Sequence, residues 1–151
     1  MQKIIISDAS CLILLDKIGY IEILHKLFGS ILTTGEVAKE FNRPLPEWIH
    51  LQEPSDKNYQ TIIETSLDKG EASAIALAVE MEDCLLIIDE LKGRRFAMQM
   101  GLKFTGTLGI LVDAKESGII KLVKPLLEQI KQTNFRVGEQ IEQIILNRAG
   151  E

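Results

Sequence analysis

The chain has 151 residues, of which 46% are hydrophobic and 26% are charged, as in an ordinary globular protein of one domain. No run of about 18 apolar residues occurs, so the sequence argues against a membrane span. The formal net charge of −5 argues against strong non-specific binding of nucleic acid over the whole surface, but it does not exclude an enzyme that holds one phosphate locally.

The first residues, M-Q-K-I-I-I-S-D, are too few and charged too early for a secretory signal, so we interpret them as the start of the fold. The two cysteines, Cys11 and Cys84, lie inside apolar runs, which is typical of small buried residues in a reducing cytoplasm. The two histidines, His25 and His50, have no second ligand at metal-binding spacing, and we expect no zinc site.

Short apolar runs alternate with helical patterns along the whole chain. Strands are predicted at about 3–7, 30–34, 48–51, 85–88 and 102–105. Helices are predicted at about 10–17, with Ser10 as the N-cap, and at about 20–28, 36–41, 57–67, 70–81, 91–100, 107–117, 121–132 and 137–148. This order indicates an α/β domain with a mainly parallel sheet and right-handed crossovers, covering residues 1–151 and ending in two amphipathic helices at about 121–148.

Two of the predicted strands run directly into a carboxylate. Residues 4–8 are I-I-I-S-D and residues 85–90 are L-L-I-I-D-E, and runs this apolar are typical of strands buried on both faces of a parallel sheet. Ligands of such sheets bind beyond the carboxyl ends of the strands. We therefore expect Asp8 and Asp89 to lie at one edge, where a hard metal ion could be held.

Two helices add further carboxylates to this edge. Glu36 and Glu40 are four residues apart on the helix after the second strand and share a face, and Glu71 is in the first turn of the most apolar helix. Like charges about 4 Å apart repel by about 1 kcal/mol in water and by about 4 kcal/mol at an effective dielectric near 20. A cluster of carboxylates therefore favours a compensating Mg²⁺ or Mn²⁺, which could activate water and neutralise a phosphodiester oxygen.

Each of these residues also has a simpler structural explanation. Asp8 and Asp89 could be N-caps of the helices that follow their strands. Glu71 could do no more than complement the helix dipole. One residue of the pair Glu36 and Glu40 is expected to be an ordinary solvated charge, so the joint arrangement carries more weight than any single residue.

Basic and hydroxyl residues near the acids are candidate supporting groups. The stretch K-G-R-R at 92–95 contains Arg94 and Arg95, which could clamp a phosphate or could simply begin a solvated helix. Ser10 and Thr107 could hold water at a metal or could cap helices. The stretch T-G-T-L-G at 105–109 lacks the G-K-[ST] ending of a phosphate-binding P-loop, and no set of residues indicates covalent catalysis.

Four stretches in this order resemble the PIN-domain family of metal-dependent ribonucleases, whose best-known small members are VapC-type toxins. The resemblance covers about residues 3–125, and residues 105–120 resemble one PIN-like branch in particular. The matching stretches are I-I-S-D-A-S-C-L-I-L-L (5–15), T-T-G-E-V-A-K-E-F (33–41), G-E-A-S-A-I-A-L-A (70–78) and L-L-I-I-D-E-L-K-G-R-R-F-A (85–97).

The resemblance implies a three-layer α/β/α fold, a Mg²⁺ or Mn²⁺ site and endonuclease activity on RNA. It assigns the metal and the catalysis to Asp8, Glu40, Glu71 and Asp89, prefers Glu40 over Glu36, and makes Glu90 a candidate additional carboxylate. Glu71 stands where the toxins usually carry the shorter Asp, which is a departure from the family pattern. The resemblance also implies a homodimer and, for toxins, an antitoxin protein that inserts into the active-site groove.

The leading hypothesis from the sequence is therefore a cytoplasmic, metal-dependent endoribonuclease of toxin type. The main alternative is a non-catalytic binding module on the same fold, which the Glu at position 71 and the acidic surface would fit. A phosphoacceptor domain ranks lower, because it would need a Lys after the last strand, whereas Lys103 lies inside the predicted strand. The RNA target, the antitoxin and the number of metal ions are not defined by the sequence.

Overall fold

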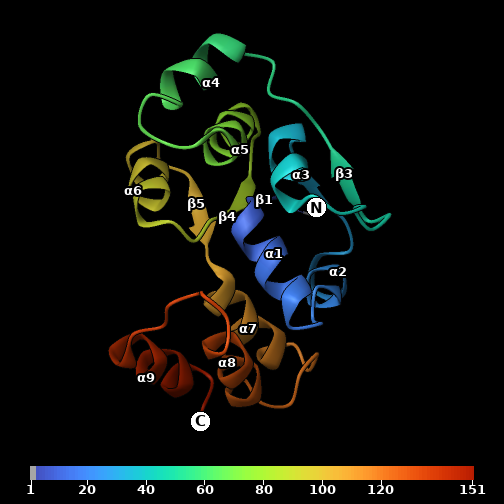
Figure 1. Cartoon of the computed structure of the whole chain (residues 1–151), viewed down its shortest axis with the longest axis vertical. Helices are drawn as coiled ribbons and strands as arrows, with labels where there is room; N and C mark the ends of the chain where they lie inside the picture. Colours follow the sequence, from blue (N-terminus) through green and yellow to red (C-terminus); the bar gives the residue numbers. More distant parts are fainter. Residues whose placement is uncertain (1–2) are drawn as a thin grey trace.

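The computed structural model describes residues 3–151, in which a central parallel sheet is enclosed by helices (Figure 1). The sheet has five strands in the order β3-β2-β1-β4-β5, and every neighbouring pair is parallel. The strands are β1 (Ile4–Ser7), β2 (Ile31–Thr33), β3 (Ile49–Leu51), β4 (Cys84–Ile87) and β5 (Lys103–Thr105). The predicted α/β class and parallel sheet are confirmed.

The helices connect these strands and continue beyond the last one. They are α1 (Ala9–Lys17), α2 (Glu22–Phe28), α3 (Gly35–Phe41), α4 (Lys57–Ile63), α5 (Lys69–Glu80), α6 (Leu91–Gln99), α7 (Thr107–Glu116), α8 (Lys124–Lys131) and α9 (Glu139–Arg148). Each lies within a few residues of its predicted range. No helix in residues 3–151 is long and apolar enough to cross a membrane.

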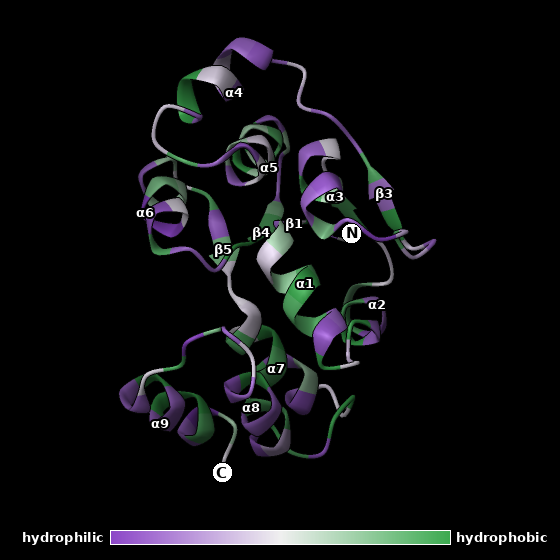
Figure 2. Ribbon diagram, viewed as in Figure 1, coloured by the Kyte–Doolittle hydropathy of each residue, from purple (hydrophilic) through white to green (hydrophobic). Residues whose placement is uncertain are grey.

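Alternate residues of the strands enter two separate cores, one on each face of the sheet. Ile5 and Ile87 pack with α1, α2, α7 and α8, whereas Ile6 and Leu86 pack with α5 and α6. This alternation follows from the two-residue period of a strand, and it explains why the strands are apolar throughout. The result is the three-layer α/β/α arrangement that the family resemblance implied, with α1 hydrophobic along much of its length (Figure 2) and five of its residues buried.

Capping side chains, rather than helix propensity alone, decide where the helices begin at the carboxyl edge of the sheet. Asp8 follows β1 and accepts a hydrogen bond from the Cys11 N–H, so Asp8, and not the predicted Ser10, is the N-cap of α1. Thr34 follows β2 and accepts from the Val37 N–H at 3.2 Å. Such a side-chain acceptor satisfies an N–H that the first helical turn cannot pair internally.

Two helices are shorter than predicted for local reasons. The last predicted turn of α4 is replaced by tight turns, in which the Thr65 and Ser66 N–H groups donate to carbonyls three residues earlier. The helix α8 begins at Lys124 and not at 121 because Pro125 has no N–H to donate, and a proline is therefore accommodated in the first turn of a helix but not in its interior.

Candidate metal centre

Asp8 is a buried carboxylate at the end of β1. Its side chain is 1% exposed, and Oδ1 accepts the capping hydrogen bond from the Cys11 N–H at 3.4 Å. The other oxygen, Oδ2, is buried and has no hydrogen-bond partner among the described residues. Burial, followed by the charge of Asp89, raises the pKa of Asp8 well above its ordinary value, and the backbone N–H groups of Cys11 and Asp89 oppose this rise only in part. The capping role and a free acceptor oxygen therefore coexist in one side chain.

Asp89 lies beside Asp8 at the carboxyl edge of the neighbouring strand. Ser7 and Ile87 are paired residues of β1 and β4, so each strand reaches its aspartate within two residues of this pair. From β1 the chain moves outward through β2 and β3 and then returns to place β4 on the other side of β1. The gap between β1 and β4 is thus a topological switch point, where open parallel sheets bind their ligands.

Thr107 fixes both oxygens of Asp89. Its backbone N–H donates to Oδ1 at 2.8 Å, and its hydroxyl donates to Oδ2 at 2.6 Å. Thr107 is fully buried at the first position of α7, so the carboxylate is held in one orientation by a rigid element. Thr107 was a candidate supporting residue in the sequence, and the structure shows what it contacts: it orients the Asp89 carboxylate directly.

Glu71 brings a second buried carboxylate with a free oxygen. It lies in the first turn of α5, with 9% of its surface exposed, and its Oε2 atom has no hydrogen-bond partner among the described residues. Burial and the nearby charges of Asp68 and Glu90 raise the pKa of Glu71 to about 7. A carboxylate that only complemented the helix dipole would face water, so the burial of Glu71 favours a more specific role.

Two glycines allow the backbone to approach these acids closely. A Cβ atom at Gly106 would lie 2.8 Å from Asp89 Oδ1. A Cβ atom at Gly93 would lie 2.5 Å from the Ile88 side chain and 3.3 Å from Glu71 Oε2. Any side chain at either position would displace an acid or its support, and the sequence pattern alone gave no sign of this requirement.

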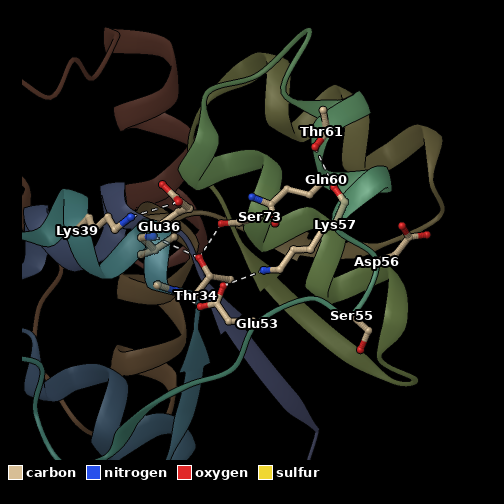
Figure 3. Close-up of polar contacts among 12 residues, drawn as sticks. Thr34, Glu36, Lys39, Glu53, Ser55, Asp56, Lys57, Gln60, Thr61 and Ser73 are labelled. Carbon is tan, nitrogen blue, oxygen red and sulfur yellow. Dashed lines mark hydrogen bonds and ion pairs between the residues drawn. The ribbon is translucent and has the colours of Figure 1, made fainter.

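Asp8, Glu71 and Asp89 form the centre of an acidic cluster, and Glu40 lies at its exposed rim. It is in the last turn of α3, and its carboxylate lies against Gly70, where a side chain would collide with Oε1. Burial, followed by the charge of Asp68, raises the pKa of Glu40. Glu36, one turn earlier, instead forms an ion pair with Lys39 at 3.6 Å (Figure 3). The preference for Glu40 over Glu36 stays a prediction.

Asp68 is an acid of this region that the sequence analysis did not select. It is the N-cap of α5, accepting from the Glu71 N–H at 2.8 Å, and its charge raises the pKa of both Glu71 and Glu40. It thereby links the rim to the centre of the cluster. An aspartate three residues before Glu71, at the start of an apolar helix, is the capping pattern that could have identified it.

A pair of hydroxyl groups holds α3 against α5 near these acids. Thr34 and Ser73 are fully buried, and their hydroxyl oxygens are 2.6 Å apart (Figure 3). The Ser73 hydroxyl also donates to the Gly70 carbonyl at 2.8 Å. Because this pair ties the start of α3 to α5 two residues after Glu71, it fixes the position from which Glu71 projects.

The remaining candidate residues occupy different places around the cluster. Glu90 is the exposed N-cap position of α6, and its charge acts on Glu71. Arg94 packs over the Phe104 ring at 5.2 Å, and its Nε atom is buried without a hydrogen-bond partner among the described residues. Arg95 faces a separate cavity between α6 and the turn after α4. Ser10 lines a cleft that also contains Asp89.

The acids fit a divalent cation by their chemistry, although they do not form a closed cage. Carboxylate oxygens are the ligands that Mg²⁺ and Mn²⁺ prefer, and two of these oxygens, on Asp8 and Glu71, are buried without a partner. Within residues 3–151, however, no three His, Cys, Asp or Glu side chains are grouped closely enough to hold a metal ion. The region is thus a set of neighbouring acids and not a completed coordination site.

A comparison with protein families identifies the chain. A family model described as a PIN domain matches residues 4–151, and the chain therefore belongs to the PIN-domain family. No curated protein matches the sequence. The family assignment agrees with the five-stranded parallel sheet and its helical layers, and PIN domains are generally nucleases that use divalent metal ions.

The raised pKa of Glu71 predicts a defined pH dependence of stability when no metal is present. The folded state holds the proton up to about pH 7, whereas the unfolded chain releases it near pH 4.5, so the folded state binds more protons between these values. Stability must then fall as the pH rises from about 4.5 to 7. We expect Glu71→Gln to flatten this fall in thermal melts in EDTA, because the glutamine does not titrate.

Glu22→Gln is the matched control, because Glu22 is exposed in the first turn of α2. It should keep the slope of the parent protein. If the melting temperatures of the parent and of Glu71→Gln fell equally across this pH range, Glu71 would not be protonated in the metal-free protein.

Proposed function

We propose that this PIN-domain protein is a Mg²⁺- or Mn²⁺-dependent endoribonuclease that hydrolyses phosphodiester bonds in RNA. The observation that carries the proposal is Asp8, whose buried and unpartnered Oδ2 atom lies at the switch point of the sheet beside Asp89. An isolated buried negative charge is strongly unfavourable and persists only if a proton or a cation neutralises it. A cation at this position would serve both stability and catalysis.

The proposed ligands are Asp8, Glu71 and Asp89, with Glu40 joining from the rim. When bound, a divalent ion lowers the pKa of water and neutralises charge on a phosphodiester oxygen. Asp8 and Glu71 each offer a free buried oxygen, and Thr107 keeps Asp89 from rotating. Arg94 of α6, held over the Phe104 ring of β5, is a positive charge that could balance the developing charge on the phosphate.

The test of this function is RNA cleavage with and without EDTA by the parent protein and by Asp8→Asn. The substitution keeps the size of the side chain and its capping oxygen but removes the negative charge. Since this removes a ligand from the proposed centre, we expect the Mn²⁺-dependent rate to fall by about 100-fold or more, while thermal stability in EDTA stays the same or rises.

Asp83→Asn provides the matched control for this measurement. Asp83 directly precedes β4 and is exposed at the opposite end of the sheet from Asp89, and its positive φ of 52° is a conformation that asparagine also accepts. The control should cut RNA like the parent. Equal rates for Asp8→Asn and the parent would end the nuclease proposal.

The contact between Thr107 and Asp89 predicts a graded loss of activity. Thr107→Val removes the hydroxyl donor to Oδ2 but keeps the backbone donor to Oδ1, so Asp89 gains freedom to rotate. We expect about a 10- to 100-fold lower rate of cleavage and a higher Mn²⁺ concentration at half-maximal activity. Thr107→Ser should restore both values.

Thr61→Val is the control for the loss of a threonine hydroxyl, because Thr61 is exposed on α4 and donates only to the Lys57 carbonyl. If Thr107→Val lowered thermal stability without changing the Mn²⁺ requirement, Thr107 would be a structural residue with no part in positioning Asp89.

The toxin of a toxin–antitoxin pair is the biological role that we propose for this nuclease, and the support for it is the family resemblance of the motifs. A toxin of this type should arrest growth when it is expressed alone, and co-expression of an antitoxin should restore growth. We expect arrest with the parent and with Asp83→Asn but not with Asp8→Asn. Normal growth during accumulation of active parent enzyme would contradict the toxin role and leave the ribonuclease proposal standing.

A non-catalytic binding module is the second candidate function. It is favoured by the absence, within residues 3–151, of three acids grouped for metal binding. In that case the parent protein would bind its partner equally well in EDTA and in Mn²⁺, and RNA would remain intact in both conditions. Cleavage that EDTA abolishes in the parent and that Asp8→Asn lacks would exclude this candidate.

A further inference from the structure

A cleft of about 500 Å³ opens directly beside Asp89. Three separate segments form its walls: α1, the junction between β4 and α6, and residues 134–136 between α8 and α9. The connection between α8 and α9 turns back toward the sheet (Figure 1), and its residues 134–136 line the cleft. Its volume lies in the range of about 300–1,000 Å³ that is usual for small-ligand sites. A cleft of this size suits a single nucleotide.

The charges in the cleft are arranged in a way that suits a phosphate diester. Lys17 of α1 and Arg136 are exposed cations in its wall, and neither forms an ion pair with any of the described residues. Asp89 and Glu90 lie on another wall. An RNA strand that crosses the cleft would therefore meet two free cations next to the proposed catalytic acids, on a chain whose net charge is −5.

The apolar part of the cleft suits the flat face of a base. Phe135 packs against the core on one side and lines the cleft on the other. Its backbone is held in place because its N–H donates to Thr133 Oγ1 at 3.1 Å, while the Thr133 hydroxyl donates to the Ile130 carbonyl at 2.6 Å. Leu91, an apolar residue that is 61% exposed, also lines the cleft. An anchored ring and an exposed apolar side chain could enclose a base between them.

We propose that this cleft, which we call the Phe135 cleft, binds one unpaired nucleotide of a single-stranded RNA next to the bond that is cut. Phe135 stacks on the base, and Arg136 and Lys17 bind the flanking phosphates. Asp89, which belongs to both the cleft and the catalytic acids, places the bound strand next to the site of cleavage. The proposal rests on the proposed ribonuclease function and adds to it the residues, contributed by α1 and by the connection between α8 and α9, that hold the nucleotide beside the cut. Single-stranded RNA is generally recognised by such stacking on aromatic side chains.

The test is the binding of a fluorescently labelled single-stranded oligoribonucleotide in EDTA, where no cleavage interferes. Phe135→Leu keeps an apolar side chain against the core but removes the aromatic face, so we expect affinity to fall by about 10-fold or more. Phe135→Trp should retain the affinity of the parent. Phe28→Leu is the control, because Phe28 also packs against this core but does not line the cleft.

The salt dependence of the same binding tests the two cations. Each phosphate contact contributes about 0.7 to the slope of log affinity against log salt for single strands. Arg136→Gln and Lys17→Gln should therefore each lower the slope by about that amount. Lys26→Gln, which removes an exposed charge on α2 outside the cleft, should leave it unchanged, and an RNA duplex of equal length should compete poorly.

The outcomes separate this proposal from the proposed function. Loss of binding in Phe135→Leu, with the altered slopes, supports the cleft even if the parent protein fails to cut RNA in Mn²⁺. Unchanged affinity in Phe135→Leu and unchanged slopes in the two cation variants overturn it, even if the parent is an active ribonuclease. Failure of the parent to bind single-stranded RNA at all also overturns it.

Discussion

The burial of Asp8 between β1 and α1 is the constraint on which the site depends. One oxygen begins α1, and the other is enclosed without a partner beside a second aspartate and within the field of Glu71. A domain is stable by only about 5–15 kcal/mol, and an uncompensated charge in such a position would consume a large part of that margin. A proton or a cation on Asp8 removes this cost. The fold is therefore most stable with positive charge bound at the switch point of the sheet.

The acids differ in how firmly their carboxylate oxygens are held by neighbouring residues. Asp89 accepts one hydrogen bond from Thr107 on each oxygen and lies against Gly106, so its direction is set, while each oxygen keeps a second lone pair for a ligand. Asp8 and Glu71 each keep one oxygen free, and the missing side chain at Gly93 leaves room for Glu71 to approach. A site that orients one acid and leaves others available can accept a ligand without a large rearrangement, which is the arrangement expected of a preorganised centre. The Phe135 cleft then extends this centre toward unpaired RNA, with cations placed where the acids would otherwise repel the strand.

The sequence predicted what depends on local pattern and missed what depends on distant segments. The runs before Asp8 and Asp89 had to be central strands because they are apolar on both faces, and the parallel topology then brought the two acids to one edge. The rim position of Glu40 could not be deduced, since it depends on how α3 packs against α5 through Thr34 and Ser73. Asp68 and Gly106 were equally hidden, because their importance lies in the distance to an acid elsewhere in the chain. Phe135 lies between the last two predicted helices, and nothing local indicates that the segment between α8 and α9 returns to Asp89.

The most direct test of the central claim is calorimetric titration of the protein with Mn²⁺ at pH 6.5 in two buffers with different heats of ionisation. The pKa of Glu71 is raised to about 7, so if Glu71 becomes a ligand at this pH, Mn²⁺ binding must release protons into the buffer, and the measured heat will differ between the two buffers. The account predicts net proton release, which Glu71→Gln reduces. An absence of binding at millimolar Mn²⁺, or binding with the same heat in both buffers, would contradict the claim that the buried carboxylates hold a cation.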